Sequence, residues 1–205
     1  MKKFRMAEIS VAIGLIVAII ISVAGFGAEC KNIRQDVVRL HILANSDSAE
    51  DQQIKLAVRD ALLSSGKDLF GGTVNVENAQ QSLELQKDEL VETANRVLAE
   101  NGFDYETRIY LAEEYFSTRE YEEFTLPAGE YLALKVILGE GEGHNWWCVM
   151  FPPLCLPAAS ENTDLDAVFG RDGAEIVRAE SKYVMRFKIV EIFENLKNKI
   201  KSSSN

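Results

Sequence analysis

The chain has 205 residues, a hydrophobic fraction of 47% and a formal net charge of −10 at pH 7. That length suits one domain beside a short terminal segment, and the composition is ordinary for a globular protein. The acidic balance argues against nucleic acid as a partner and against peripheral docking on anionic lipid, because both need clustered Lys and Arg side chains.

The first element in the chain is a charge-free apolar run from Ile9 to Ala28. A helix of about 20 residues, at about 1.5 Å rise each, spans the roughly 30 Å hydrocarbon layer of a membrane. Lys2, Lys3 and Arg5 precede the run, which by the positive-inside rule keeps the N-terminus in the cytoplasm and sends the remainder outward. We therefore predict that residues 1–28 form a signal peptide or a transmembrane anchor.

The sequence does not decide whether this segment is cleaved or retained. Ser22 and Ala24 offer small residues at the two positions that a signal-peptidase site requires. The length of the apolar run favours an uncleaved anchor, which would also bind the membrane. Beyond it we predict a single extracytoplasmic domain over residues 29–200 and a disordered tail over 201–205.

The first predicted strand, over 37–43, has one apolar face and one face that carries Arg39 and His41. Ser48 then has the chemistry of a helix N-cap, and the helix that follows has an apolar stripe. We expect the stripe to pack on the apolar face of the strand. The residues that would meet there are Val38, Leu40 and Ile42 from the strand and Ile54, Val58 and Leu62 from the helix.

The remaining elements complete the predicted fold. The patterns predict a helix over 76–100, strands over 105–111, 131–138 and 146–151, irregular chain over 157–178, and a last helix starting near Ser181 with Phe187, Val190 and Leu196 inward. An acidic cluster that includes Glu113 and Glu114 is expected to be a solvated face. Together these elements predict an α+β fold, with a small, mainly antiparallel sheet covered by helices and preceded by one N-terminal hydrophobic helix.

Rare residue types gather between Gly139 and Cys155. Both tryptophans, one of two histidines, two of three cysteines and two of four prolines fall within these 17 residues. This density singles out the segment as the candidate functional region, and three interpretations of it stay open.

The first interpretation is catalytic. His144 and Cys148 could form a thiol–imidazole pair, with Asn145 or His41 orienting the imidazole. Zinc would draw on His144, Cys148, Cys155 and His41, but the short ligand pairs typical of zinc sites are missing, so no metal is predicted. The second interpretation is a disulfide between Cys148 and Cys155, which an oxidising compartment favours.

The third interpretation is recognition of a partner. Adjacent tryptophans on a strand point to opposite faces, so only one of Trp146 and Trp147 can fill the core. Tryptophan is enriched in interface hot spots, and the flanking glycines and acidic residues favour an exposed loop. The predicted partner-binding residues are His144, Asn145, Trp146 and Trp147, with Arg39, His41 and Asn45 as secondary surface candidates.

Two long segments resemble a known family. VRLHILANSDSAEDQQIKLAVRDALL at 38–63 and GEGHNWWCVMFPPLC at 141–155 closely resemble the signature segments of stage II sporulation protein R, called SpoIIR. The resemblance runs from about Asp36 to Phe193, and 157–180 matches only loosely. Both segments are long and rich in rare residues, which makes the match far more specific than a short glycine fingerprint.

The resemblance implies a function that periodicity does not show. Members of the family are made in the forespore of endospore-forming bacteria and exported into the space between the two septum membranes. There they act on SpoIIGA, a membrane-embedded aspartic-type protease, which then processes the pro-sigma E precursor in the mother cell. The resemblance thus implies an intercellular signal, anchored or released, that is no enzyme and needs no cofactor. A secreted hydrolase using His144 and Cys148 is the alternative.

Overall fold

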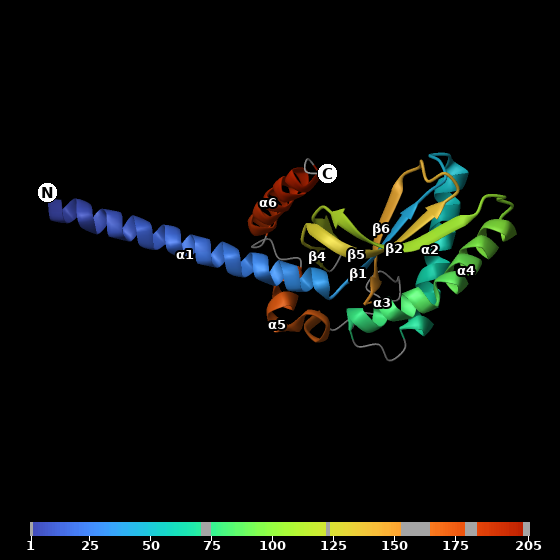
Figure 1. The fold of residues 1–205 in the computed structure, drawn as a ribbon, viewed down its shortest axis with the longest axis horizontal. Helices are drawn as coiled ribbons and strands as arrows, with labels where there is room; N and C mark the ends of the chain where they lie inside the picture. Colours follow the sequence, from blue (N-terminus) through green and yellow to red (C-terminus); the bar gives the residue numbers. More distant parts are fainter. Residues whose placement is uncertain (1, 71–74, 122–123, 153–164, 179–183, 203–205) are drawn as a thin grey trace. The chain divides into compact units, whose positions relative to one another are not determined.

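The computed structural model describes residues 2–70, 75–121, 124–152, 165–178 and 184–202 (Figure 1). Its elements are α1 (Lys2–Gln35), β1 (Val38–Leu43), α2 (Ala49–Leu69), α3 (Val76–Leu85), α4 (Lys87–Glu100), β2 (Thr107–Phe116), β3 (Arg119–Glu120), β4 (Thr125–Leu126), β5 (Gly129–Leu138), β6 (Asn145–Phe151), α5 (Leu165–Val177) and α6 (Val184–Ser202). The chain forms two compact units, described separately below. The predicted domain boundaries at 29 and 200 stay a prediction.

The larger unit, residues 35–116 and 130–168, is built on a four-stranded sheet in the order β2-β5-β1-β6. The α+β class and the N-terminal apolar helix are confirmed. The sheet is mixed, because β1 runs parallel to β5 and antiparallel to β6. A parallel pair needs a long crossover connection, and the chain between β1 and β5 includes the three helices α2, α3 and α4.

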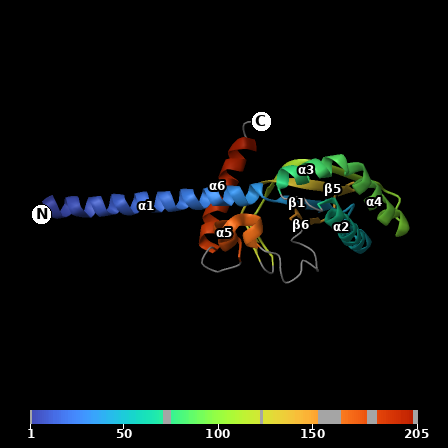
Figure 2. The same cartoon turned by 90° about the horizontal axis from the view of Figure 1, so that it is seen from below.

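One face of this sheet is covered by α2, α3 and α4, which lie together in both views (Figures 1 and 2). The predicted packing of β1 on α2 is confirmed, since one buried cluster contains the residues that were expected to meet. The cluster joins Val38, Leu40 and Ile42 to Ile54, Val58 and Leu62. Ser48 caps α2 as expected, because its hydroxyl accepts a hydrogen bond from the Asp51 N–H at 3.1 Å.

Leu40→Ala is expected to lower the free energy of unfolding by about 2–5 kcal/mol. Leu40 is fully buried, so truncation removes apolar contacts and leaves a cavity. Chemical denaturation with a circular-dichroism readout measures the change, and Leu85→Ala, at a 78% exposed position, is the control. A loss below about 1 kcal/mol for Leu40→Ala would contradict the packing, given the usual cost of core truncations.

Two element predictions are wrong. The helix predicted over 76–100 is interrupted at Gln86 and forms α3 and α4. Neither Gly nor Pro occurs at the break, so local propensity gives no signal there. Residues 165–177, expected to be irregular, form α5, whose two helical parts meet at Gly170 with φ of 66°. The glycines in this segment made the sequence pattern indicate irregular chain. The helix is stabilised by tertiary packing, because Phe169, Ala174 and Val177 are all buried.

The smaller unit, residues 1–34, 117–129 and 169–205, contains α1, the two-stranded sheet β3-β4, and α6. The C-terminal part of α1 contributes Phe26, Cys30 and Ile33 to buried positions. From α6, Phe187 and Val190 are buried as expected, whereas Leu196 is 58% exposed, so its inward placement was wrong. α6 continues to Ser202, so the start of the predicted tail is helical, and 203–205 lie outside the described residues.

The helix α1 is long and apolar enough to cross a membrane. The most apolar 18-residue window of its stretch Glu8–Gln35 has a mean hydropathy of 2.7, and only 6% of that window is buried. An apolar helix that the fold leaves exposed fits an export signal or a membrane anchor.

Candidate functional site

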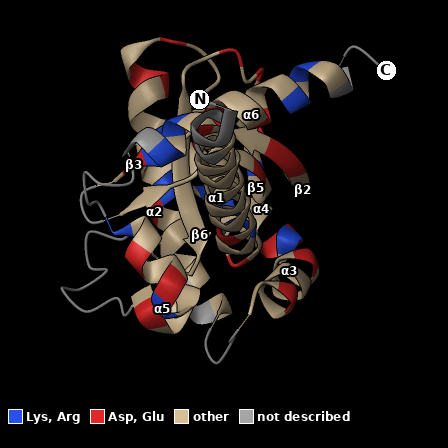
Figure 3. Ribbon diagram, turned by 90° about the vertical axis from the view of Figure 1, so that its left-hand side faces the viewer, with Lys and Arg blue, Asp and Glu red and all other residues tan. Residues whose placement is uncertain are grey.

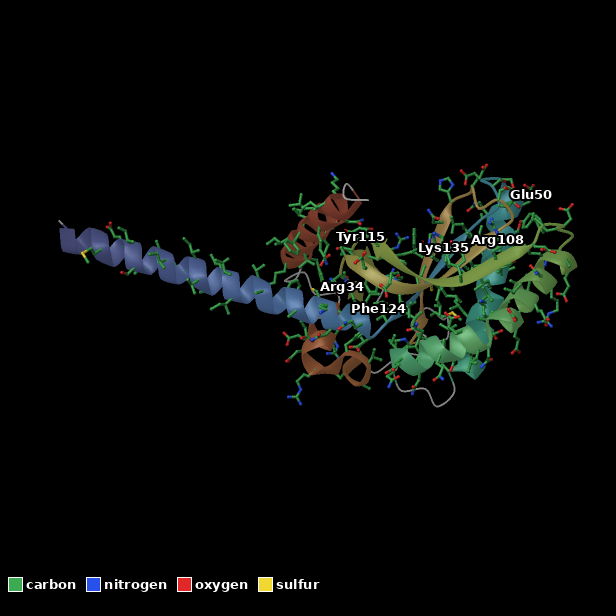
Figure 4. The ribbon with its side chains drawn as sticks, viewed as in Figure 1. Arg34, Glu50, Arg108, Tyr115, Phe124 and Lys135 are labelled. Atoms are coloured by element: carbon green, nitrogen blue, oxygen red, sulfur yellow. The ribbon has the colours of Figure 1, made fainter. Side chains whose placement is uncertain are left out.

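Two loops of the larger unit, far apart in sequence, are joined into one surface, which we call the loop pair. They are the β1–α2 turn, residues 44–48, and the β5–β6 loop, residues 139–144. The Gly143 N–H donates to the Ala44 carbonyl at 2.9 Å, and the Glu142 N–H donates to the Asn45 carbonyl at 3.2 Å. The Asn45 side-chain oxygen accepts the Glu140 N–H at 3.0 Å. Glu50, at the start of α2, marks this end of the unit in Figure 4.

A buried carboxylate, Asp51, lies beneath the turn and fixes its shape. Its carboxylate accepts hydrogen bonds from the Asn45 amide at 2.9 Å, the Ser46 hydroxyl at 2.6 Å and the Tyr105 hydroxyl at 2.7 Å. Burial alone would raise the pKa of Asp51, but these hydrogen bonds outweigh it and lower the pKa below the ordinary value. Burial, together with the hydrogen bond to Asp51, raises the pKa of Tyr105. The turn is therefore held from beneath by a charged carboxylate that accepts hydrogen bonds.

His144 stands at the tip of the loop pair with 78% of its side chain exposed. Its backbone N–H donates to an Asp47 side-chain oxygen at 2.6 Å, and its ring Nδ1 contacts the same oxygen. The Lys55 ammonium, buried on α2, donates to the His144 carbonyl at 2.8 Å. The hydrogen bond from His144 is the main cause that lowers the pKa of Asp47. The backbone of His144 is thus held while its imidazole faces solvent.

The two tryptophans point to opposite faces of β6, as predicted. Trp146 pairs with Ile42 and packs against the core cluster, with the Arg59 guanidinium 4.5 Å from its ring centroid. Trp147 pairs with His41 on the other face and stacks on its ring, with the centroids 3.7 Å apart. Both tryptophans are partly exposed. Only Trp147 lies on the same side of β6 as the Asn145 side chain.

A polar network lies on the sheet face opposite the helices. His41 contacts a Glu114 carboxylate oxygen through Nδ1 at 2.7 Å and the Asn145 side-chain oxygen through Nε2 at 2.8 Å. Lys135, labelled on β5 in Figure 4, donates to the other Glu114 oxygen. Strands β1, β2, β5 and β6 therefore each contribute one side chain. Glu114, expected in a solvated face, is a partly buried member of this network, which corrects that expectation.

Two of the secondary surface candidates are not on the surface. Arg39 is fully buried and His41 is 5% exposed, whereas Asn45 is half-buried. The Arg39 Nε donates to the Cys148 carbonyl at 3.1 Å, and its guanidinium carbon lies 4.3 Å from the centroid of the Phe116 ring. Polar residues on one side of a strand indicated an exposed face, but aromatic rings cover this one.

The Glu114 network is expected to stabilise the fold in a pH-dependent way. Burial alone would raise the pKa of Glu114, but hydrogen bonds from His41 and Lys135 prevail and lower it from 4.5. A lowered folded-state pKa contributes stability that is present above about pH 4.5 and lost as the pH falls through the folded-state value. Thermal melts from pH 7 to pH 3 should therefore show the deficit of Glu114→Gln shrinking at low pH. A deficit that stays constant with pH would contradict this assignment.

The catalytic pair is not assembled. His144 is exposed before β6, while Cys148 is buried in the core cluster opposite Leu40. Four residues of strand at about 3.3 Å each separate the two by roughly 13 Å, too far for a thiol–imidazole contact. Cys155 lies outside the described residues, so its disulfide with Cys148 stays a prediction. Among the described residues, no three His, Cys, Asp or Glu side chains form a group that could hold a metal ion.

Several residues of the site were missed at the sequence level. Asp47 and Asp51 lie on either side of the predicted N-cap Ser48, and carboxylates beside a cap could have drawn attention to them. Tyr105, Glu114 and Lys135 come from other elements, and Tyr105 is 54 positions from Asp51. No pattern within one element could have joined them.

The fold and the site together define a small α+β protein with a rigidly supported, exposed polar loop pair. The family model for stage II sporulation protein R matches residues 34–161, so the chain belongs to that family. The matched stretch contains both loops of the pair and ends before α5 and α6.

A curated relative supports the assignment. The chain is 37% identical over 123 residues to stage II sporulation protein R of Bacillus subtilis strain 168. The alignment covers 60% of this chain and 55% of that protein, so it spans about half of the relative's length. No solved structure matches the chain significantly.

Proposed function

We propose that this protein is an exported sporulation signal that activates the membrane-embedded protease SpoIIGA by binding it through the loop pair. Activation would trigger processing of the pro-sigma E precursor in the mother cell. Membership of the family carries the sporulation role. The protease and its precursor come from what the family resemblance implies.

The observation that supports binding through the loop pair is its construction. Both segments of the family resemblance contribute to it, and the hydrogen bond from Glu140 to Asn45 bridges 95 positions of sequence. A surface with a fixed backbone and an exposed imidazole loses little conformational entropy on binding, which favours recognition. Trp147 and Asn145 extend the surface along one side of β6.

Co-expression in a host that does not sporulate tests the proposal. The exported chain, the protease and the sigma precursor would be produced together and in each pair, and precursor cleavage scored by immunoblot. Cleavage is expected only when all three are present. Cleavage by the chain and the precursor without the protease would instead favour the hydrolase alternative. Absence of cleavage with all three correctly placed would overturn the proposal.

Export is expected to depend on the apolar run in α1. A reporter enzyme that folds only outside the cytoplasm, fused after residue 60, should be active with the native chain. Two Arg residues introduced into the middle of the Ile9–Ala28 run should abolish that activity, because charge opposes membrane insertion. Activity of the same fusion inside the cytoplasm would contradict export, and N-terminal sequencing of the mature chain would report cleavage.

A further inference from the structure

The last helix, α6, carries an exposed apolar stripe. Its members are separated by three and four positions, which places them on one side of a helix. They are Ile189, Ile192, Phe193, Leu196 and Ile200, with exposures of 47%, 62%, 65%, 58% and 62%. A different side of α6 is buried in the smaller unit through Phe187, Val190 and Glu194. The helix therefore has one packed face and a second apolar face that meets solvent.

Basic residues border this stripe on both sides. At 3.6 residues per turn, Lys188 and Lys199 fall along one border, while Arg186 and Lys197 fall along the other. α6 has five basic side chains and two acidic ones, a net charge of +3, in a chain whose net charge is −10 (Figure 3). Screening limits surface charge interactions to about 8 Å, so the local charge of α6 decides what it attracts.

α6 packs on α1 where the apolar run ends. The Phe26 and Phe187 rings meet edge to face with centroids 5.6 Å apart, and Ser22, Val23 and Ile189 line a small cavity beside them. About two turns beyond Phe26 along α1, the Arg34 guanidinium pairs with Glu194 at 3.3 Å. In Figure 1 α6 lies beside α1 and is inclined to it, and in Figure 2 it runs across α1, so the two helices are not parallel. The contact with Phe26 places α6 at the level where the apolar run of α1 ends, which is where a membrane-spanning α1 would leave the membrane.

We propose that α6 is an interfacial helix that lies on the outer surface of the membrane that α1 enters. The stripe from Ile189 to Ile200 sits among the lipid headgroups and upper acyl chains, and the bordering Lys and Arg side chains contact anionic phosphates. The net negative charge of the whole chain argued against docking on anionic lipid, but α6 by itself has a net positive charge.

Depth-dependent fluorescence quenching in vesicles tests this proposal, independently of protease activation. The full chain would be reconstituted into vesicles of phosphatidylcholine with phosphatidylglycerol, with an environment-sensitive dye on Phe193→Cys. The matched control is Asn195→Cys, which lies on the polar side of the same helix. The unsubstituted chain, labelled in parallel, gives the background from the native cysteines. At Phe193→Cys we expect a blue-shifted emission and strong quenching by lipids that carry a quencher near the headgroup, and at Asn195→Cys much weaker effects.

Further experiments distinguish lipid from other binding partners of the apolar stripe. Combined Lys188→Gln, Lys197→Gln and Lys199→Gln should reduce the quenching at Phe193→Cys toward its value in pure phosphatidylcholine vesicles. Water-like emission without quenching at Phe193→Cys would overturn the proposal. Energy transfer between donor-labelled and acceptor-labelled chains, without lipid quenching, would also overturn it and assign the stripe to a second copy. Far-UV circular dichroism confirms that each variant is folded.

Discussion

His144→Ala is expected to lower precursor processing sharply while leaving the melting temperature within about 2 °C of the native value. The side chain is 78% exposed, and substitutions at such positions change stability by about 0.5 kcal/mol or less. An interface hot spot contributes about 2 kcal/mol or more, which corresponds to a roughly 30-fold loss of affinity. Processing is measured in the co-expression assay, and thermal stability is measured on purified chains.

Glu142→Ala is the matched control, because Glu142 is exposed on the same loop and only its backbone bonds to Asn45. It should leave both readouts unchanged. Asp47→Ala removes the hydrogen-bond partner that orients His144 and should reduce processing as well. Normal processing by His144→Ala would exclude the imidazole from the contact with the protease.

Only the tertiary structure predicts different stabilities for Asn145→Ala and His144→Ala. The sequence predicts that both variants keep near-native stability. In the structure, the Asn145 amide oxygen lies 2.8 Å from His41 Nε2, and truncation leaves that buried ring nitrogen without this hydrogen bond. Such losses cost about 1–3 kcal/mol, so Asn145→Ala should lower stability as well as processing.

Gly143→Ala is expected to be the most damaging single-atom addition to the loop pair. A Cβ at this position would meet the Ser46 carbonyl group, with its carbon at 2.5 Å, and the Ala44 Cβ at 2.9 Å. The two loops would have to separate, which removes the bond from the Gly143 N–H to the Ala44 carbonyl and displaces His144. Overpacking of this kind costs about 1–3 kcal/mol in unfolding free energy, and processing should be lost with it.

Hydrogen exchange gives a local readout for this variant. The amides of Glu142 and Gly143, which bond across the loop pair, should lose protection, while amides of the β1–β5 ladder stay protected. Glu142→Ala again serves as the control. Native protection and native processing in Gly143→Ala would show that the close approach of the loops is not needed for activity.

The parts of the fold that the sequence predicted are those governed by a single period. Leu40 and Ile42 share one face of β1, and Ile54 and Val58 share one face of α2, because residue spacing sets the face within each element. The opposite placement of Trp146 and Trp147 follows from the same geometry. Cap and turn chemistry around Ser48 set the start of α2.

What the sequence by itself determined is therefore the N-terminal apolar segment, the α+β class, the main packing face and the family. Only the tertiary structure decided that Arg39 and His41 are buried, that Glu114 joins Lys135 and His41, and that the two signature loops bond to each other. It also left Leu196 of α6 exposed, although the sequence predicted an inward position for it. Periodicity determines the side of an element on which a residue lies, whereas the neighbour that covers that side depends on segments distant in sequence.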